Sequence, residues 1–158
     1  MQPLASSYLS QKQSSTPAAV VYSEKALQQD LERLRSLWEQ FQSSRHRDSV
    51  YLYLTGVFDL VRWWVAEGRA VGRARRALRW QPREGGMFLE PFSVIIFCTS
   101  SGKGANKKAR SKWSRVLRFA AEYKNDREPL DAFIKRKGGI NGCAALYTRR
   151  LGRRAKTH

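Results

Sequence analysis

Basic side chains at helical spacing are the residues of this sequence that could do chemistry, and that chemistry is phosphate binding. When residues 106–124 are projected as a helix, four of them gather on one face: Lys108, Lys112, Arg115 and Arg118. Lysine and arginine neutralise nucleic-acid phosphates, which gives an affinity that falls steeply with salt. Phe119 projects among the four, either as an exposed aromatic for stacking or as a side chain packed under a neighbouring element.

Two further basic groups have the same character. Arg69, Arg73 and Arg76 share one face of a helix that is expected to continue through Gly68 and Gly72. Like charges at this spacing weaken a helix, so an anionic partner would stabilise it, and a solvated face is the equal alternative. The other group ends a short helix and consists of Lys135, Arg136 and Lys137.

The C-terminal segment has the outline of a helix-turn-helix unit. Pro129 begins the short helix, Gly138 and Gly139 form a corner, and a last helix is expected over residues 140–151. Gly139 stands where a larger residue is usual in such a unit, so a generic helical corner is the alternative.

A helix-turn-helix unit would turn part of the last helix toward a DNA groove. The side chains it would present are Asn141, Thr148, Arg149 and Arg150, and asparagine and arginine can recognise base edges by paired hydrogen bonds. Arg153 and Arg154 open a basic tail, residues 153–158, that would contact the nucleic-acid backbone without reading sequence.

The positive charge is confined to one part of the chain. The net charge is +17, yet residues 1–67 hold seven basic and seven acidic residues, which leaves 23 basic and six acidic residues in the remainder. Charge of one sign at this density repels itself, so it favours a polyanionic partner. Nucleic acid is the first candidate, and an anionic membrane or an acidic protein is the second.

The sequence lacks the patterns of catalytic and metal sites. His46 and His158 lie in a linker and at the chain end, and Cys98 and Cys143 are embedded in apolar runs, without metal-ligand spacing. The SSGKG segment at 100–104 fails as a phosphate-binding loop, because it lacks the required glycine and the Ser or Thr after lysine. We therefore expect no enzyme activity and no cofactor, and the Cys usage fits the cytoplasm.

The elements before the basic region form a scaffold. Residues 1–22 are expected to be a flexible arm, and residues 23–81 an antiparallel helical hairpin with an Arg-rich end. A short coiled-coil seam would pack within the chain or join two copies as a homodimer: Leu27, Leu31, Leu34, Trp38 and Phe41. A membrane span over residues 50–66 is not expected, because Asp59 and Arg62 interrupt it.

The predicted fold is all-α, with a loop at 82–90 and a basic helical region at 91–152. One short buried strand at 93–98 is the alternative to a helix there. This organisation predicts a cytoplasmic DNA-binding protein, nucleoid-associated in a bacterium. RNA binding is one alternative, and a coiled-coil scaffold that docks an acidic partner or an anionic membrane is another.

Overall fold

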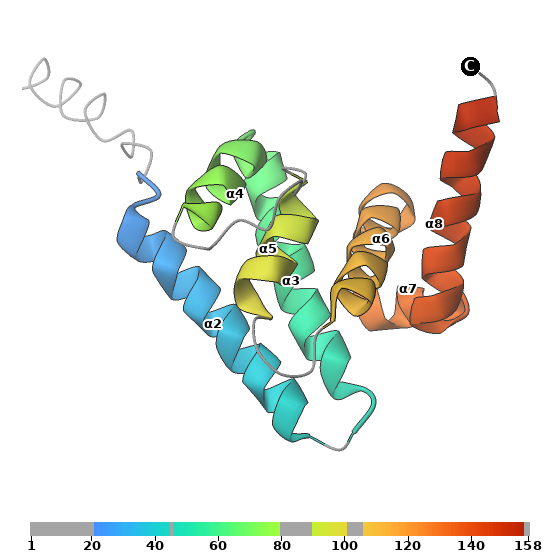
Figure 1. Ribbon diagram of the computed structural model, residues 1–158, viewed down its shortest axis with the longest axis horizontal. Coiled ribbons are helices and arrows are strands. Elements are labelled where there is room, and N and C mark those ends of the chain that lie inside the picture. The colour runs from blue at the N-terminus through green and yellow to red at the C-terminus, as the bar shows by residue number, and fades with distance from the viewer. Residues whose placement is uncertain (1–20, 45, 80–89, 101–105, 157–158) are drawn as a thin grey trace, which may run out of the picture.

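Helices alone make up the secondary structure of the part of the chain described by the computed structural model, residues 21–44, 46–79, 90–100 and 106–156 (Figure 1). This confirms the all-α prediction. In chain order they are α2 (Glu24–Ser43), α3 (Ser49–Ala66), α4 (Ala70–Leu78), α5 (Pro91–Thr99), α6 (Lys107–Tyr123), α7 (Leu130–Arg136) and α8 (Gly139–Lys156).

Side chains at the helix starts explain several of these boundaries. Ser23 Oγ accepts a hydrogen bond from the first turn of α2, and Asn106 Oδ1 does the same for α6. The Glu90 carboxylate accepts two backbone N–H groups at the start of α5, where Pro91 occupies a first-turn position. The sequence predicted one helix that continues through Gly68, but the structure has two helices, α3 and α4. The break lies at Gly68, whose φ of 68° is incompatible with an α-helix.

α2 and α3 lie side by side, joined by a short connection (Figure 1). Four residues of the predicted seam are buried within the chain: Leu27, Leu31, Leu34 and Trp38. The fifth, Phe41, is partly buried and packs against the same core. Gly56 permits the close approach, since a Cβ there would come within 2.8 Å of Leu34 Cδ2. The chain's own helices therefore cover most of the surface that a homodimer would have used.

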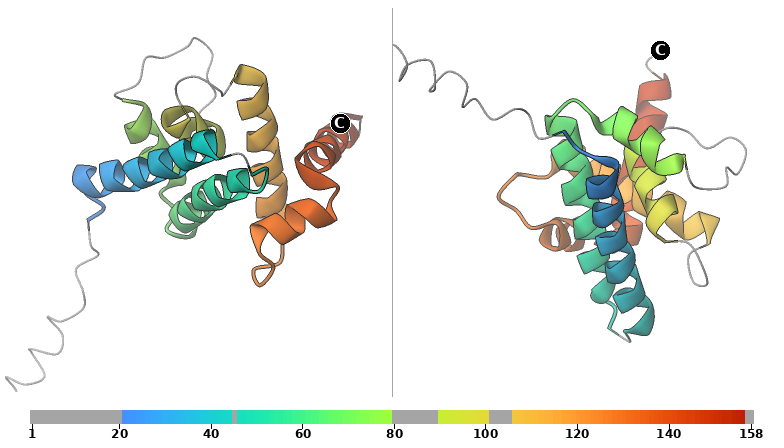
Figure 2. Two further views of the ribbon diagram at one scale, coloured as in Figure 1. Left: turned by 90° about the horizontal axis from the view of Figure 1, so that it is seen from below. Right: turned by 90° about the vertical axis from the view of Figure 1, so that its left-hand side faces the viewer.

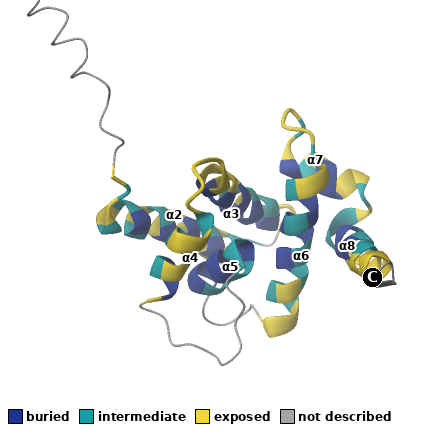
Figure 3. Cartoon of the chain, turned by 90° about the horizontal axis from the view of Figure 1, so that it is seen from above, coloured by how far each residue is buried: buried dark blue, intermediate teal, exposed yellow. Residues whose placement is uncertain are grey.

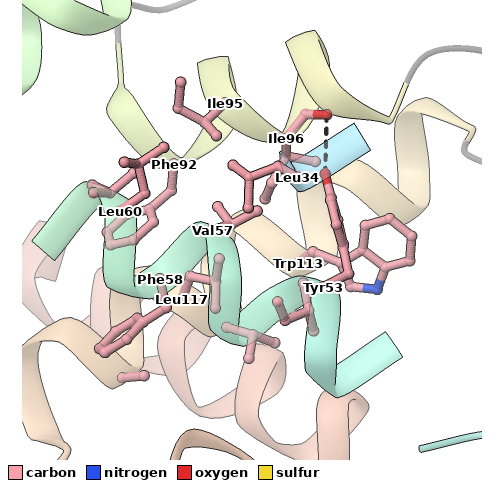
Figure 4. Close-up of a cluster of buried hydrophobic side chains, with 14 of the residues drawn as sticks. Leu34, Tyr53, Val57, Phe58, Leu60, Phe92, Ile95, Ile96, Trp113 and Leu117 are labelled. Carbon is pink, nitrogen blue, oxygen red and sulfur yellow. Dashed lines mark hydrogen bonds between the residues drawn. The ribbon is translucent and has the colours of Figure 1, made fainter. Parts of the chain in front are cut away.

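α5 is a central helix and not the strand offered as the alternative for residues 93–98. It packs against α2, α3, α4 and α6, and its side chains Val94, Ile95, Ile96 and Cys98 are all buried. A single strand would leave its backbone groups unpaired in this setting, whereas a helix pairs its own. Figure 4 shows Tyr53 from α3 reaching α5, where its hydroxyl donates to the Ile96 carbonyl at 3.4 Å.

α6 connects this core to α7 and α8. Trp113, Val116, Leu117 and Ala120 pack inward. Phe119 is buried as well, with its ring centre 5.8 Å from that of Phe133 in α7. The interpretation of Phe119 as an exposed stacking residue is therefore wrong, because α7 covers it.

The predicted loop at 82–90 is described only at Glu90, and the predicted arm at 1–22 only at its last two residues. Tyr22 belongs to the folded structure, since its ring centre lies 5.4 Å from that of Trp63. α8 runs through Lys156, so the first residues of the predicted basic tail continue the helix. Within the described ranges, none of the helices combines the length and apolar content that a membrane crossing needs.

Candidate nucleic-acid interface

Two packed helices carry most of the basic residues of the C-terminal region. The sequence of α6 contains six lysines and arginines and that of α8 contains five, against one acidic residue, Glu122. α6 and α8 contact each other extensively, so these charges are held close together. We call the solvent-facing side chains of this pair the α6–α8 surface: Lys108, Lys112, Arg115, Arg118, Arg149, Arg150, Arg153 and Arg154.

Direct contacts join the basic face of α6 to α8. Arg115 Nη1 donates to Thr148 Oγ1 at 2.8 Å, and the Arg118 guanidinium carbon lies 5.1 Å from the centre of the Tyr147 ring. Neither contact involves a carboxylate, so no negative charge offsets the two guanidinium groups at these contacts while their positions are fixed. Such preorganised cations suit the binding of phosphate oxygens.

Glu122 holds the far end of this surface together. Its carboxylate binds Arg150, and Arg154 Nη2 lies 3.3 Å from its other oxygen. Arg150 also lies over the Tyr123 ring at 4.8 Å. Desolvation and then the nearby charge of Arg154 lower the pKa of Arg150. One carboxylate thus serves two arginines, and the local balance stays positive.

Three cations of the α6–α8 surface have no ion pair with another described residue. Lys108 and Arg149 are exposed and Lys112 is half-buried. Figure 3 shows exposed residues at the N-terminal end of α6 and toward the C-terminal end of α8. These side chains are available to an external anion without the loss of an existing ion pair.

The predicted group on α4 does not join this surface, and two of its members have structural partners. Arg73 Nη1 lies 2.5 Å from a Glu67 oxygen, and its guanidinium carbon lies 4.2 Å from the centre of the Tyr22 ring. Arg76 Nη2 lies 3.0 Å from a Glu24 oxygen, and its Nη1 donates to the Tyr22 carbonyl at 3.1 Å. Both arginines fasten α4 to the beginning of α2 and the end of α3, whereas Arg69 is exposed.

The basic end of α7 also has internal partners. Arg136 forms two hydrogen bonds of 2.9 Å with the Glu128 carboxylate, and they hold the pKa of Glu128 below its ordinary value. Lys135 Nζ lies 3.7 Å from an Asp48 oxygen. Lys137 lies over the Phe133 ring at 6.0 Å, without a carboxylate partner among the described residues. Of these three cations, only Lys137 forms no ion pair with a described residue, although its charge also helps to lower the pKa of Glu128.

The corner between α7 and α8 depends on glycine. Gly138 and Gly139 have φ values of 94° and 79°, which other residues rarely adopt. A Cβ on Gly142 would come within 2.7 Å of the Lys137 carbonyl oxygen, so α8 starts in close contact with the end of α7. The backbone geometry explains why Gly139 occupies a position where the sequence pattern favoured a larger residue.

α8 buries one side and exposes another. Cys143, Ala144 and Tyr147 are buried. Asn141, Thr148 and Arg149 are exposed, although the Thr148 hydroxyl is already bonded to Arg115. The exposed side chains can form hydrogen bonds and ion pairs with a polyanion, while the buried side fixes the helix on α6 and α7.

Two residues of the surface were missed by sequence reasoning. Glu122 organises two arginines, and Tyr123 is the exposed aromatic, with 47% of its surface accessible. A signal for Glu122 was present, since it is the single acidic residue in a strongly basic helix. A helical projection places Tyr123 on the same face as the buried Trp113 and Ala120, so the sequence pattern gave no signal of its exposure.

The cysteines lack the features of reactive groups. Burial raises the pKa of Cys98 and of Cys143 to about 11 each, so both thiols stay protonated at neutral pH. The described residues hold no group of three or more His, Cys, Asp or Glu side chains that could bind a metal ion.

Comparison of the chain with protein-family models, curated proteins and solved structures finds no match, so a function has to be argued from the α6–α8 surface itself.

Proposed function

We propose that the protein binds DNA through the α6–α8 surface, by neutralising backbone phosphates. One observation carries the proposal: two packed helices hold eleven basic residues against a single acidic one. Charge of one sign on two packed helices weakens the fold through self-repulsion, and a polyanion removes that penalty. Nucleic acid is a polyanion with regularly spaced phosphates, and several lysines and arginines on neighbouring helices can contact such phosphates together.

α8 is the element that approaches the bases in this proposal. It follows a tight glycine corner after α7, and Asn141 and Arg149 are exposed on it. Both side-chain types can form paired hydrogen bonds with base edges in the major groove. Arg115 and Arg118 flank α8 and would contact the phosphates beside it. The cellular place that fits this function is the cytoplasm, at the nucleoid in a bacterium.

RNA binding is the second candidate, and the exposed Tyr123 ring favours it. An aromatic side chain beside arginine can stack on unpaired bases, which RNA loops supply. Competition between labelled random duplex DNA and unlabelled structured RNA separates the two. We expect duplex DNA to displace the probe at lower concentration than RNA of equal length, and the reverse order would move the proposal to RNA.

The test of the function is a titration of full-length protein with random duplex DNA at several salt concentrations. We expect log affinity to fall linearly and steeply with log salt concentration, because bound phosphates release counterions. A flat salt response would remove the phosphate-contact mechanism. Co-sedimentation with anionic vesicles and no binding to DNA would instead point to an anionic membrane as the partner.

A further inference from the structure

A second group of exposed arginines lies on α4 and at its two ends. Arg69, Arg75 and Arg79 are exposed, and none forms an ion pair with another described residue. α4 contains no acidic residue, and the nearby carboxylates of Glu67 and Glu24 already bind other arginines. We call these three exposed arginines the α4 surface.

The α4 surface and the α6–α8 surface lie in different parts of the molecule. α4 packs on α2, α3 and α5, whereas α8 packs on α6 and α7. Figures 1 and 3 show α5 and α6 between α4 and α8 along the long axis of the molecule. Axes of packed helices are about 10 Å apart, so the two surfaces are separated by roughly 20–30 Å.

The contacts of α4 give this second surface a fixed position. The ion pairs of Arg73 and Arg76 hold α4 against α2 and α3, and Ala74, Ala77 and Leu78 are buried beneath it. Figure 2 shows α4 lying across the helices below it. The exposed arginines are therefore presented by a docked helix and not by a loose segment.

We propose that the α4 surface is a second DNA-contacting surface, so that one chain bridges two DNA segments. This inference rests on the proposed function, because it extends phosphate binding from the α6–α8 surface to a separate one. The sequence analysis had grouped Arg69 with the cations of α6 as phosphate-binding residues, and the separation of α4 from α6 and α8 in the fold is what makes bridging accessible to a single chain. When one surface is bound, a second DNA segment held nearby is present at a high effective concentration for the other surface, which raises the overall affinity without new contacts.

The test is a two-step capture with full-length protein. Random duplex DNA is immobilised, loaded with protein and washed, and a second fluorescent duplex is then offered. The wild type should retain the second duplex. The triple variant Arg69→Gln, Arg75→Gln, Arg79→Gln should load normally, because its α6–α8 surface is intact, yet it should capture at least about fivefold less of the second duplex at moderate salt.

A matched variant carries the same loss of charge at exposed residues that lie outside both surfaces: Lys25→Gln, Arg33→Gln, Arg47→Gln. It should capture like the wild type. Unchanged capture by the α4 variant would overturn bridging through α4 and indicate self-association. Equal loss of loading and capture would mean one continuous site, which also overturns it. Wild-type protein that loads but captures nothing refutes bridging alone, whereas failure to load refutes the proposed function.

Discussion

The salt dependence of DNA binding should respond to three particular cations of the α6–α8 surface. Lys108, Lys112 and Arg149 have no ion pair within the described part of the chain, so their replacement breaks no ion pair. The triple change Lys108→Gln, Lys112→Gln, Arg149→Gln should therefore alter the stability of the fold by no more than about 0.5 kcal/mol per residue. Arg115 and Arg118 are less suitable, because they contact α8.

The expected magnitude follows from counterion release. Each lost contact with duplex DNA reduces the slope of log affinity against log salt by about 0.9, so the triple variant should lose about 2.7. Over a fourfold rise in salt, such as about 50 to 200 mM, the wild type should then lose about 40-fold more affinity than the variant. An effect of this size is well outside the error of a binding titration.

The assay is fluorescence anisotropy with random duplex DNA at four or more salt concentrations. The control is the variant Lys25→Gln, Arg33→Gln, Arg47→Gln, which carries the same net charge and alters exposed cations without ion pairs among the described residues. Its slope should stay at the wild-type value. Equal slope losses in the two variants would show that net charge alone attracts DNA, and no loss in either would refute phosphate contact at the α6–α8 surface.

Three further outcomes are expected. Glu122→Gln should tighten DNA binding, because it releases two arginines that can then contact phosphates. In the same DNA titration the slope of log affinity against log salt should become steeper by up to about 1.8. Gly142→Ala should cost about 1–3 kcal/mol in denaturant unfolding, because its Cβ meets a backbone carbonyl, whereas exposed Gly152→Ala should stabilise α8 by up to about 1 kcal/mol; equal effects would contradict this packing. Folded-state thiol pKa values of about 11, against an ordinary value of 9.0, mean that Cys98 and Cys143 contribute stability that is complete below pH 9 and is lost as the pH rises toward 11. Unfolding experiments across that range check the sign, and replacement of both cysteines by alanine should flatten the decline.

Local sequence signals predicted the elements of this fold and much of its core. Ser23 caps α2, as a serine directly before a helix can, and four of the five residues at heptad spacing in α2 are buried. These features depend on a few neighbouring residues and on helical periodicity, both of which the sequence displays directly. The sequence left a strand open at 93–98 because a continuous apolar run has no periodicity that distinguishes a buried strand from a buried helix, and the structure shows a helix there.

Contacts between distant elements account for what the sequence did not reveal. Arg76 binds Glu24 from another helix, 52 positions away, and a helical projection of α4 contains no information about that carboxylate. Phe119 projected onto a basic face, yet α7 folds over it and brings Phe133 against it. The spacing of the charges predicted which basic residues would be exposed on an isolated helix. Which of them are exposed in the folded protein depends on the packing of the other helices.

The distribution of carboxylates turns this difference into an argument about function. Among the described residues after Glu67, four of the acidic side chains already have partners: Glu90 caps α5, Glu122 binds two arginines, Glu128 binds Arg136, and Asp126 lies 4.0 Å from Arg62. The remaining cations of the α6–α8 surface have little acidic charge left to pair with among the described residues after Glu67. Ion pairs with these residues therefore leave the α6–α8 surface positively charged, which supports the proposal of a polyanionic partner, because such a partner would lower the electrostatic free energy of the surface.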